Sequence, residues 1–105
     1  MRKIDETVKK CKTSLENCYG TQFNALVLYG SVSRNQDSPM SDIDLLLLLN
    51  NKFEYFEEIR RIIEVVYPIQ LETEQLISVK PALINDFEDG TIQLYRNARK
   101  EGIFV

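Results

Sequence analysis

Three segments of the chain repeat apolar residues at the spacing of an amphipathic helix. Residues 3–18 place Ile, Val, Cys and Leu side chains on one helical face, which predicts a helix that ends near Gly20. Residues 53–66 show the same period, with charged side chains largely on the opposite face, and predict a second helix. Residues 90–100 predict a final helix, which Gly102 stops.

Short continuous apolar runs between these helices predict strands. The run from Ala25 to Tyr29 is bounded by Asn24 and a glycine, so we expect a buried strand there. Residues 43–49 are nearly all leucine, and a run this short predicts a central strand that is buried on both faces. Residues 68–72 predict a third strand, placed at an edge because Pro68 lacks a backbone donor.

The remaining segments are less regular. Residues 31–36 predict a short helix or helical turn, and residues 37–39 have the composition of a loop. Residues 73–87 stay open between helix and strand, because they begin like a helix that a proline would then interrupt. The apolar tail at residues 103–105 could add a strand at a sheet edge.

The loop between the first two strands indicates their relative direction. About a dozen residues join them, and a parallel crossover normally needs that length together with a full helix. An antiparallel pair is easier, and it would bring Gly30 and Ser31 to the same end of the sheet as Asp42 and Asp44. We therefore expect an α/β (α+β) fold, a small mixed and largely antiparallel sheet of three or more strands flanked by helices. It would form a single domain over residues 1–105.

The composition narrows the chemistry. The net charge is −3, which argues mildly against broad nucleic-acid binding. The chain contains no histidine, which excludes a histidine base, a Ser-His-Asp triad and histidine metal ligands. Catalysis would have to use carboxylates, metal ions, basic side chains or the backbone. Hard oxygen ligands favour Mg²⁺, or Mn²⁺, over zinc.

The cysteines and the start of the chain bear on the cellular compartment. Cys11 and Cys18 lie roughly 10 Å apart along the predicted first helix, too far for a disulfide, so we expect two small buried thiols in a reducing compartment. Met1-Arg2-Lys3 leads into a charged amphipathic segment rather than a signal peptide. No apolar run approaches the ~20 residues of a membrane span. We expect a cytoplasmic protein with no membrane association.

Two carboxylates open the leucine-rich strand. Asp42 and Asp44 are two residues apart, so in a strand both side chains point to one face, with their Cα atoms roughly 6.5–7 Å apart. Two negative charges beside a buried strand repel each other and resist desolvation, and a bound divalent cation relieves both costs. An isolated Asp-x-Asp is more often a capped turn at the start of a strand.

A second candidate feature ends the preceding strand. Gly30 lets the backbone approach a phosphate closely, and Ser31 adds a hydroxyl and an amide at the start of the predicted turn of helix. Arg34, one turn further on, could reach phosphate oxygens. Each of these residues alone is weak evidence, since Gly-Ser also begins ordinary helices. The ordered combination of turn and carboxylates is much stronger, and it indicates a site for a metal-bound triphosphate.

This combination resembles the nucleotidyltransferases of the DNA polymerase β superfamily. Their signature is Gly-Ser, a spacer and Asp-x-Asp, which this chain carries with ten residues between Ser31 and Asp42. The short chain is similar to the minimal nucleotidyltransferase (MNT) group, many of which are encoded beside a helical HEPN partner as toxin–antitoxin pairs. The ending Tyr95-Arg96-Asn97 … Arg99-Lys100-Glu101-Gly102 also looks like small bacterial members, and the resemblance covers most of the chain.

The resemblance implies a fold, an activity and a set of roles. In the nucleotidyltransferase fold, Gly30 and Ser31 would hold the β- and γ-phosphates of ATP or another nucleoside triphosphate, assisted by Arg34 and Ser41. Asp42 and Asp44 would bind two Mg²⁺ ions, as catalytic and metal residues. A nucleoside monophosphate, AMP in the simplest case, would pass to a hydroxyl acceptor such as a tyrosine of a HEPN-type partner. Homo-oligomers or hetero-oligomers are both compatible with the resemblance.

The family commonly has a third carboxylate on the next strand. Here the predicted strand at residues 68–72 offers Glu72 as the only acid on its face, with Gln70 beside it. Glu72 is thus a weak catalytic candidate, and Gln70 is the other residue that fits the position but cannot act as a base.

Two other functions are compatible with the sequence. The chain could be a binding module with a degenerate site that neutralises its partner by contact alone, and the unsettled third carboxylate favours this alternative. It could also be an unrelated phosphoryl-transfer enzyme with an aspartyl nucleophile, which the upstream Gly-Ser and the short chain disfavour.

Overall fold

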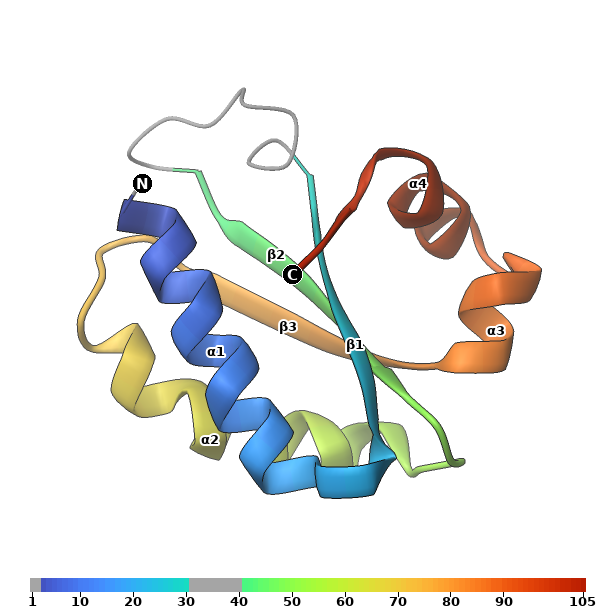
Figure 1. Cartoon of the computed structure of the whole chain (residues 1–105), viewed down its shortest axis with the longest axis horizontal. Helices are drawn as coiled ribbons and strands as arrows, with labels where there is room; N and C mark the ends of the chain where they lie inside the picture. The colour runs from blue at the N-terminus through green and yellow to red at the C-terminus, as the bar shows by residue number, and fades with distance from the viewer. Residues whose placement is uncertain (1–2, 31–40) are drawn as a thin grey trace.

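The computed structural model of the protein describes residues 3–30 and 41–105. Within them, a four-stranded sheet has the order β3-β2-β1-β4 (Figure 1). Strands β1 (Phe23–Tyr29) and β2 (Ile43–Leu49) pair antiparallel, and β3 (Ile77–Leu83) runs parallel to β2. The two-residue strand β4 (Ile103–Phe104) adds antiparallel to β1. The sheet is therefore mixed, as predicted.

Helices cover both faces of the sheet. Helices α1 (Lys3–Tyr19) and α2 (Tyr55–Gln70) lie side by side on one face (Figure 1). The short helices α3 (Ile84–Asp89) and α4 (Gln93–Glu101) lie on the other. A 3₁₀ turn, η1 (Gly20–Gln22), joins α1 to β1.

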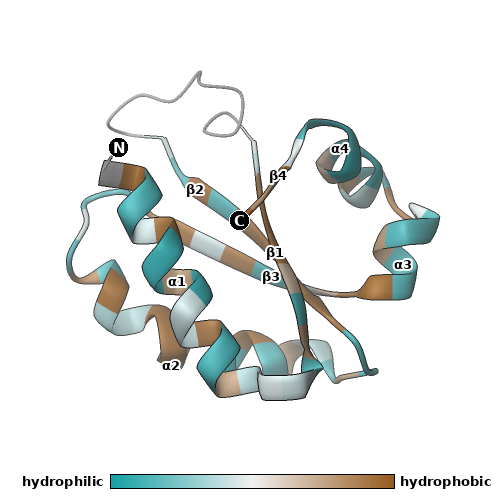
Figure 2. Ribbon diagram, in the orientation of Figure 1, coloured by the Kyte–Doolittle hydropathy of each residue, from teal (hydrophilic) through white to brown (hydrophobic). Residues whose placement is uncertain are grey.

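The alternation of side chains along β2 creates two separate cores. Its odd-numbered residues pack with α1 and α2 in the larger cluster, and Leu46 and Leu48 pack with α3 and α4 in the smaller one. All five leucines from 45 to 49 are fully buried. Figure 2 shows the resulting contrast, with apolar strands at the centre and helices that are banded apolar and polar. The run of leucines is thus a central strand rather than a helix, as predicted.

Most of the predicted elements are confirmed. The first helix extends one residue beyond the predicted range, and the first strand begins two residues earlier. The final helix ends before Gly102, and the apolar tail forms β4 on the open side of β1. The cysteines are free, as expected, and Cys11 is buried. The prediction that Cys18 is also buried is wrong, because its side chain is exposed. The predictions for residues 31–36 and 37–39 lie outside the described residues.

The predicted strand at residues 68–72 is wrong. Helix α2 continues through Pro68 to Gln70, because Val66 and Ile69 extend its buried face while the proline lies on the exposed face. The third strand comes from residues that the sequence left open, Ile77–Leu83, which pair with the whole length of β2. Hydrogen bonding and side-chain packing against β2 therefore decide the conformation of residues 77–83, whatever the helical character of the residues just before them.

The outer edge of β3 has few free donors. The backbone N–H of Ile77 points away from β2 and donates to Oε1 of Gln70 at 2.8 Å. Pro81 lies four residues further, so its missing N–H falls on the same outward side. A proline is tolerated there because an edge strand needs no donor on its free side. The same features limit pairing with a further strand.

Candidate functional site

The turn and the carboxylates predicted to meet do lie together, where β1 ends and β2 begins. Tyr29 and Asp44 are register partners, and Gly30 follows directly. Gly30 has a φ of +80°, and a Cβ atom there would lie 2.6 Å from Oδ2 of Asp44. A side chain at this position would therefore be strained and would also collide with the carboxylate. Only glycine allows the backbone turn and the acid to share this space.

Asp44 is held in an environment that disfavours its charge. Its side chain is half-buried, while Asp42, which precedes β2 by one residue, is exposed. Burial raises the pKa of Asp44 above its ordinary value of 3.8, the charge of Asp42 raises it further, and Lys80 lowers it. The two carboxylates are thus close enough to repel each other, which is the arrangement that a bound cation would relieve.

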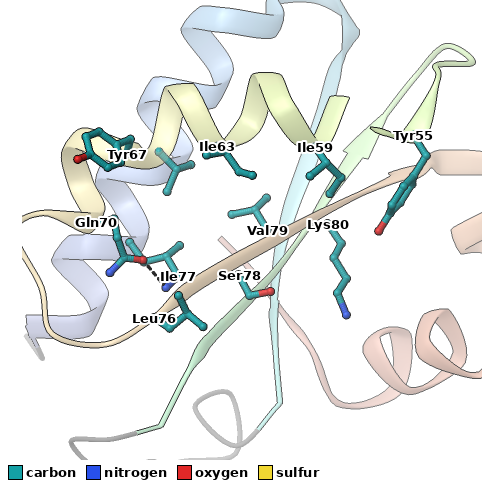
Figure 3. A pocket seen from close by; sticks show the side chains of 11 residues that line it. Tyr55, Ile59, Ile63, Tyr67, Gln70, Leu76, Ile77, Ser78, Val79 and Lys80 are labelled. Atoms are coloured by element: carbon teal, nitrogen blue, oxygen red, sulfur yellow. Dashed lines mark hydrogen bonds between the residues drawn. The ribbon is translucent and has the colours of Figure 1, made fainter. Parts of the chain in front are cut away.

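The neighbouring strand places a hydroxyl and an ammonium group beside this pair. Asp44 is in register with Ser78, and Leu46 with Lys80, so these side chains share the face of the sheet that carries Asp44. Figure 3 shows Ser78 and Lys80 directed away from α2, whereas Ile77 and Val79 point toward it. Both residues also border a largely apolar groove of about 430 Å³ between α2 and β3. Sequence reasoning missed them because it misplaced the third strand.

Two tyrosines, Tyr29 and Tyr95, pack against the smaller core on the face of the sheet that carries Asp44. Tyr29 is half-buried, and burial, Asp44 and Tyr55 together raise its pKa to about 12. Tyr95 on α4 has its pKa raised by burial first, then by Asp86 and Tyr55. Tyr55 and Tyr95 line one cavity although they come from different helices. Nothing in the local sequence around each tyrosine indicated this grouping.

The structure brings some of the predicted site residues together and not others. Gly30, Asp42 and Asp44 lie together where β1 ends and β2 begins. Ser41 lies next to them, and its carbonyl accepts a hydrogen bond from Nε2 of Gln75 at 3.0 Å. Ser31 and Arg34 lie outside the described residues.

Glu72 and Gln70 are not on a strand beside the carboxylates. Glu72 lies in the turn after α2, where its carboxylate forms an exposed ion pair with Lys10 of α1 at 2.8 Å. That pair belongs to the helical layer on one face of the sheet, whereas Asp44 faces the other. Gln70 instead caps the edge of β3, since it accepts from Ile77 and donates to the carbonyl of Gln75 at 2.8 Å. The structural premise for Glu72 as the third carboxylate, a strand at residues 68–72, is therefore lost.

The carboxylates of Asp42 and Asp44 suit a hard divalent cation whose remaining ligands come from a bound substrate and water. Over residues 3–30 and 41–105, no three Asp, Glu, Cys or His side chains gather closely enough to enclose a metal ion. Asp42 and Asp44 offer carboxylate oxygens only, the ligand type that Mg²⁺ uses when phosphates and waters complete its shell. The residues present fit such an ion together with an anionic substrate.

A mixed sheet with helices on both faces, and with a glycine turn against Asp44 at one end, is consistent with a nucleotidyltransferase fold. A comparison with family models supports the same class. The model of the family "Polymerase beta, Nucleotidyltransferase" matches residues 9–105, and the chain belongs to this family. A comparison with curated protein sequences gave no match. In the part of the chain that the structure describes, no helix has the length and apolar character needed to cross a membrane.

Proposed function

We propose that the protein is a Mg²⁺-dependent nucleotidyltransferase that moves AMP from ATP to a hydroxyl group. The acceptor would be a tyrosine of a partner protein, and the chain would act as the antitoxin of a HEPN/MNT toxin–antitoxin pair. The single observation that carries the proposal is the position of the Asp44 carboxylate, next to Asp42, in the space that a side chain at Gly30 would need, in a chain of this family. The free cysteines are compatible with a reducing compartment, and we place the protein in the cytoplasm.

The proposed roles follow from the chemistry of each residue. The turn at Gly30 lets backbone amides approach the β- and γ-phosphates, with Ser31 and Arg34 as further phosphate ligands. Asp42 and Asp44 hold Mg²⁺, which when bound lowers the cost of negative charge on the triphosphate and on the leaving pyrophosphate. Ser41 lies beside these two carboxylates and helps to position the phosphates.

The transfer exchanges one phosphorus–oxygen bond for another. The acceptor oxygen forms a bond to the α-phosphorus as the bond from that phosphorus to the oxygen bridging to the β-phosphate breaks. Pyrophosphate leaves with the electron pair, and the acceptor proton passes to solvent. Positioning and charge neutralisation would supply most of the acceleration.

The test needs the partner and a labelled nucleotide. We would first isolate proteins that bind the full chain in its source cells. Each would then be incubated with the chain, Mg²⁺ and ATP labelled at the α-phosphate. Mass spectrometry would locate the label. The proposal expects one added AMP on a partner tyrosine, lost in the double variant Asp42→Asn with Asp44→Asn. Equal neutralisation of the partner by wild type and double variant, without transfer, would refute it.

The absence of a third carboxylate among the described residues favours a second function, a binding module that inhibits by contact. The same experiment separates the two. A binding module still inhibits its partner when both aspartates are replaced, whereas an enzyme with both aspartates replaced does not.

A further inference from the structure

One basic side chain stands on the same face of the sheet as the carboxylate pair. Lys80 is exposed on the edge strand β3, two residues beyond Ser78, which is the register partner of Asp44. Figure 3 shows its side chain directed to the side of the sheet opposite α2. Lys80 is therefore the diagonal neighbour of Asp44 across the β2–β3 pair, a separation that a long side chain can span.

The strand that could complete a larger metal site carries no acid. Between Ile77 and Leu83 the side chains on the Asp44 face are Ser78, Lys80 and Ala82. Two divalent ions close together need several anionic ligands, because each ion repels the other. Among the described residues no third acidic side chain joins Asp42 and Asp44 to hold a metal ion, and the strand beside Asp44 offers an ammonium group on the same face.

We propose that Lys80 replaces one of the divalent ions, so that the site holds a single metal ion and Lys80 binds the phosphates of the nucleoside triphosphate directly. Lysine is suited to this role because its ammonium is a compact charge on a flexible stem. The inference rests on the proposed function and narrows it, since the family resemblance alone leads to an expectation of two ions. The alternative for Lys80 is a guard against edge-to-edge association, a common use of lysine on open strands.

The experiment counts ions and measures nucleotide binding without turnover. Mn²⁺ is titrated into the full chain with the non-transferable analogue α,β-methylene-ATP, and bound Mn²⁺ is counted by electron paramagnetic resonance. We expect one ion per complex in wild type and two in Lys80→Asp. In Lys80→Met the affinity for the analogue should fall about tenfold, whereas Lys80→Arg should retain it.

The matched control is Lys9→Met, an exposed lysine on α1 across the sheet, which should leave both readouts unchanged. Melting temperatures establish that each variant is folded. Two ions in wild type, one ion in Lys80→Asp, or the same affinity in Lys80→Met and Lys9→Met would each overturn the inference and leave the proposed function standing. A wild-type chain that binds neither Mn²⁺ nor the analogue would overturn both.

Discussion

The carboxylate of Asp44 occupies the space that a side chain at residue 30 would need. The two residues are brought together by the antiparallel pairing of β1 and β2, since Tyr29 lies opposite Asp44. A Cβ atom on Gly30 would come within 2.6 Å of Oδ2. The glycine therefore serves two purposes, because it permits a positive φ and leaves room for the acid.

Replacing Gly30 by alanine should cost both stability and nucleotide binding. The variant must adopt a φ that disfavours a Cβ atom, at roughly 1–2 kcal/mol, and must also displace Asp44. Gly20→Ala is the matched control, because Gly20 has a φ of +55° with nothing within 4 Å of the added atom. We expect both variants to lose stability in urea denaturation, and only Gly30→Ala to lose Mn²⁺ and ATP binding. Normal binding by Gly30→Ala would show that the contact has no functional role.

Replacing Asp44 by asparagine should stabilise the protein while removing metal binding. Its pKa is raised first by burial and then by Asp42, so the native state favours the protonated form. Stability from this group is fully present below the ordinary pKa of 3.8 and is lost as pH rises through the raised native pKa. Asp44→Asn avoids that loss, so its advantage in melting temperature should grow across this interval and then stay constant. Glu88→Gln, an exposed acid on α3, should show no such advantage.

The hydrogen bond between Tyr19 and Glu58 should contribute strongly to stability. The hydroxyl of Tyr19, at the end of α1, donates to Oε2 of the buried Glu58 on α2 at 2.7 Å. Tyr19→Phe leaves that carboxylate without its donor, which should cost about 1–3 kcal/mol in urea denaturation. Tyr67→Phe, which alters an exposed tyrosine on α2, should be neutral.

The same tyrosine should make the protein sensitive to alkaline pH. Burial, and then the hydrogen bond to Glu58, raise the pKa of Tyr19 well above its ordinary value of 10.0. The stability linked to this group is present below that ordinary value and is lost as pH rises above it. Denaturation of wild type from neutral to alkaline pH should show this loss, and Tyr19→Phe should show a shallower decline. Parallel declines would mean that other groups cause it.

Gln70 and Glu72 should matter to the fold rather than to the chemistry. Gln70→Ala removes the acceptor of the Ile77 N–H and should lower stability by about 1 kcal/mol without changing Mn²⁺ binding. Glu72→Gln breaks only the exposed pair with Lys10, which contributes little to stability because solvent screens it, and should leave AMP transfer unchanged. A large loss of transfer in Glu72→Gln would restore this residue as a catalytic candidate.

Much of the architecture could be predicted because it depends on local patterns. The helical period of residues 3–18 and the unbroken apolar run at residues 43–49 each identify their element without knowledge of its neighbours. The length of the intervening loop was enough to predict the antiparallel pair. That pairing in turn predicts the position of Gly30, Asp42 and Asp44 at one end of the sheet.

The sequence by itself determined the elements around the turn and the two carboxylates, and the tertiary structure decided what stands beside them. Residues 77–83 form a strand because β2 offers a partner along their whole length, a long-range interaction that no local period reports. Because of that pairing, Lys80 lies on the same face of the sheet as Asp44. Glu72 instead pairs with Lys10 in the helical layer on the opposite face. The side of the sheet that a residue faces depends on strand register, which only the folded chain sets.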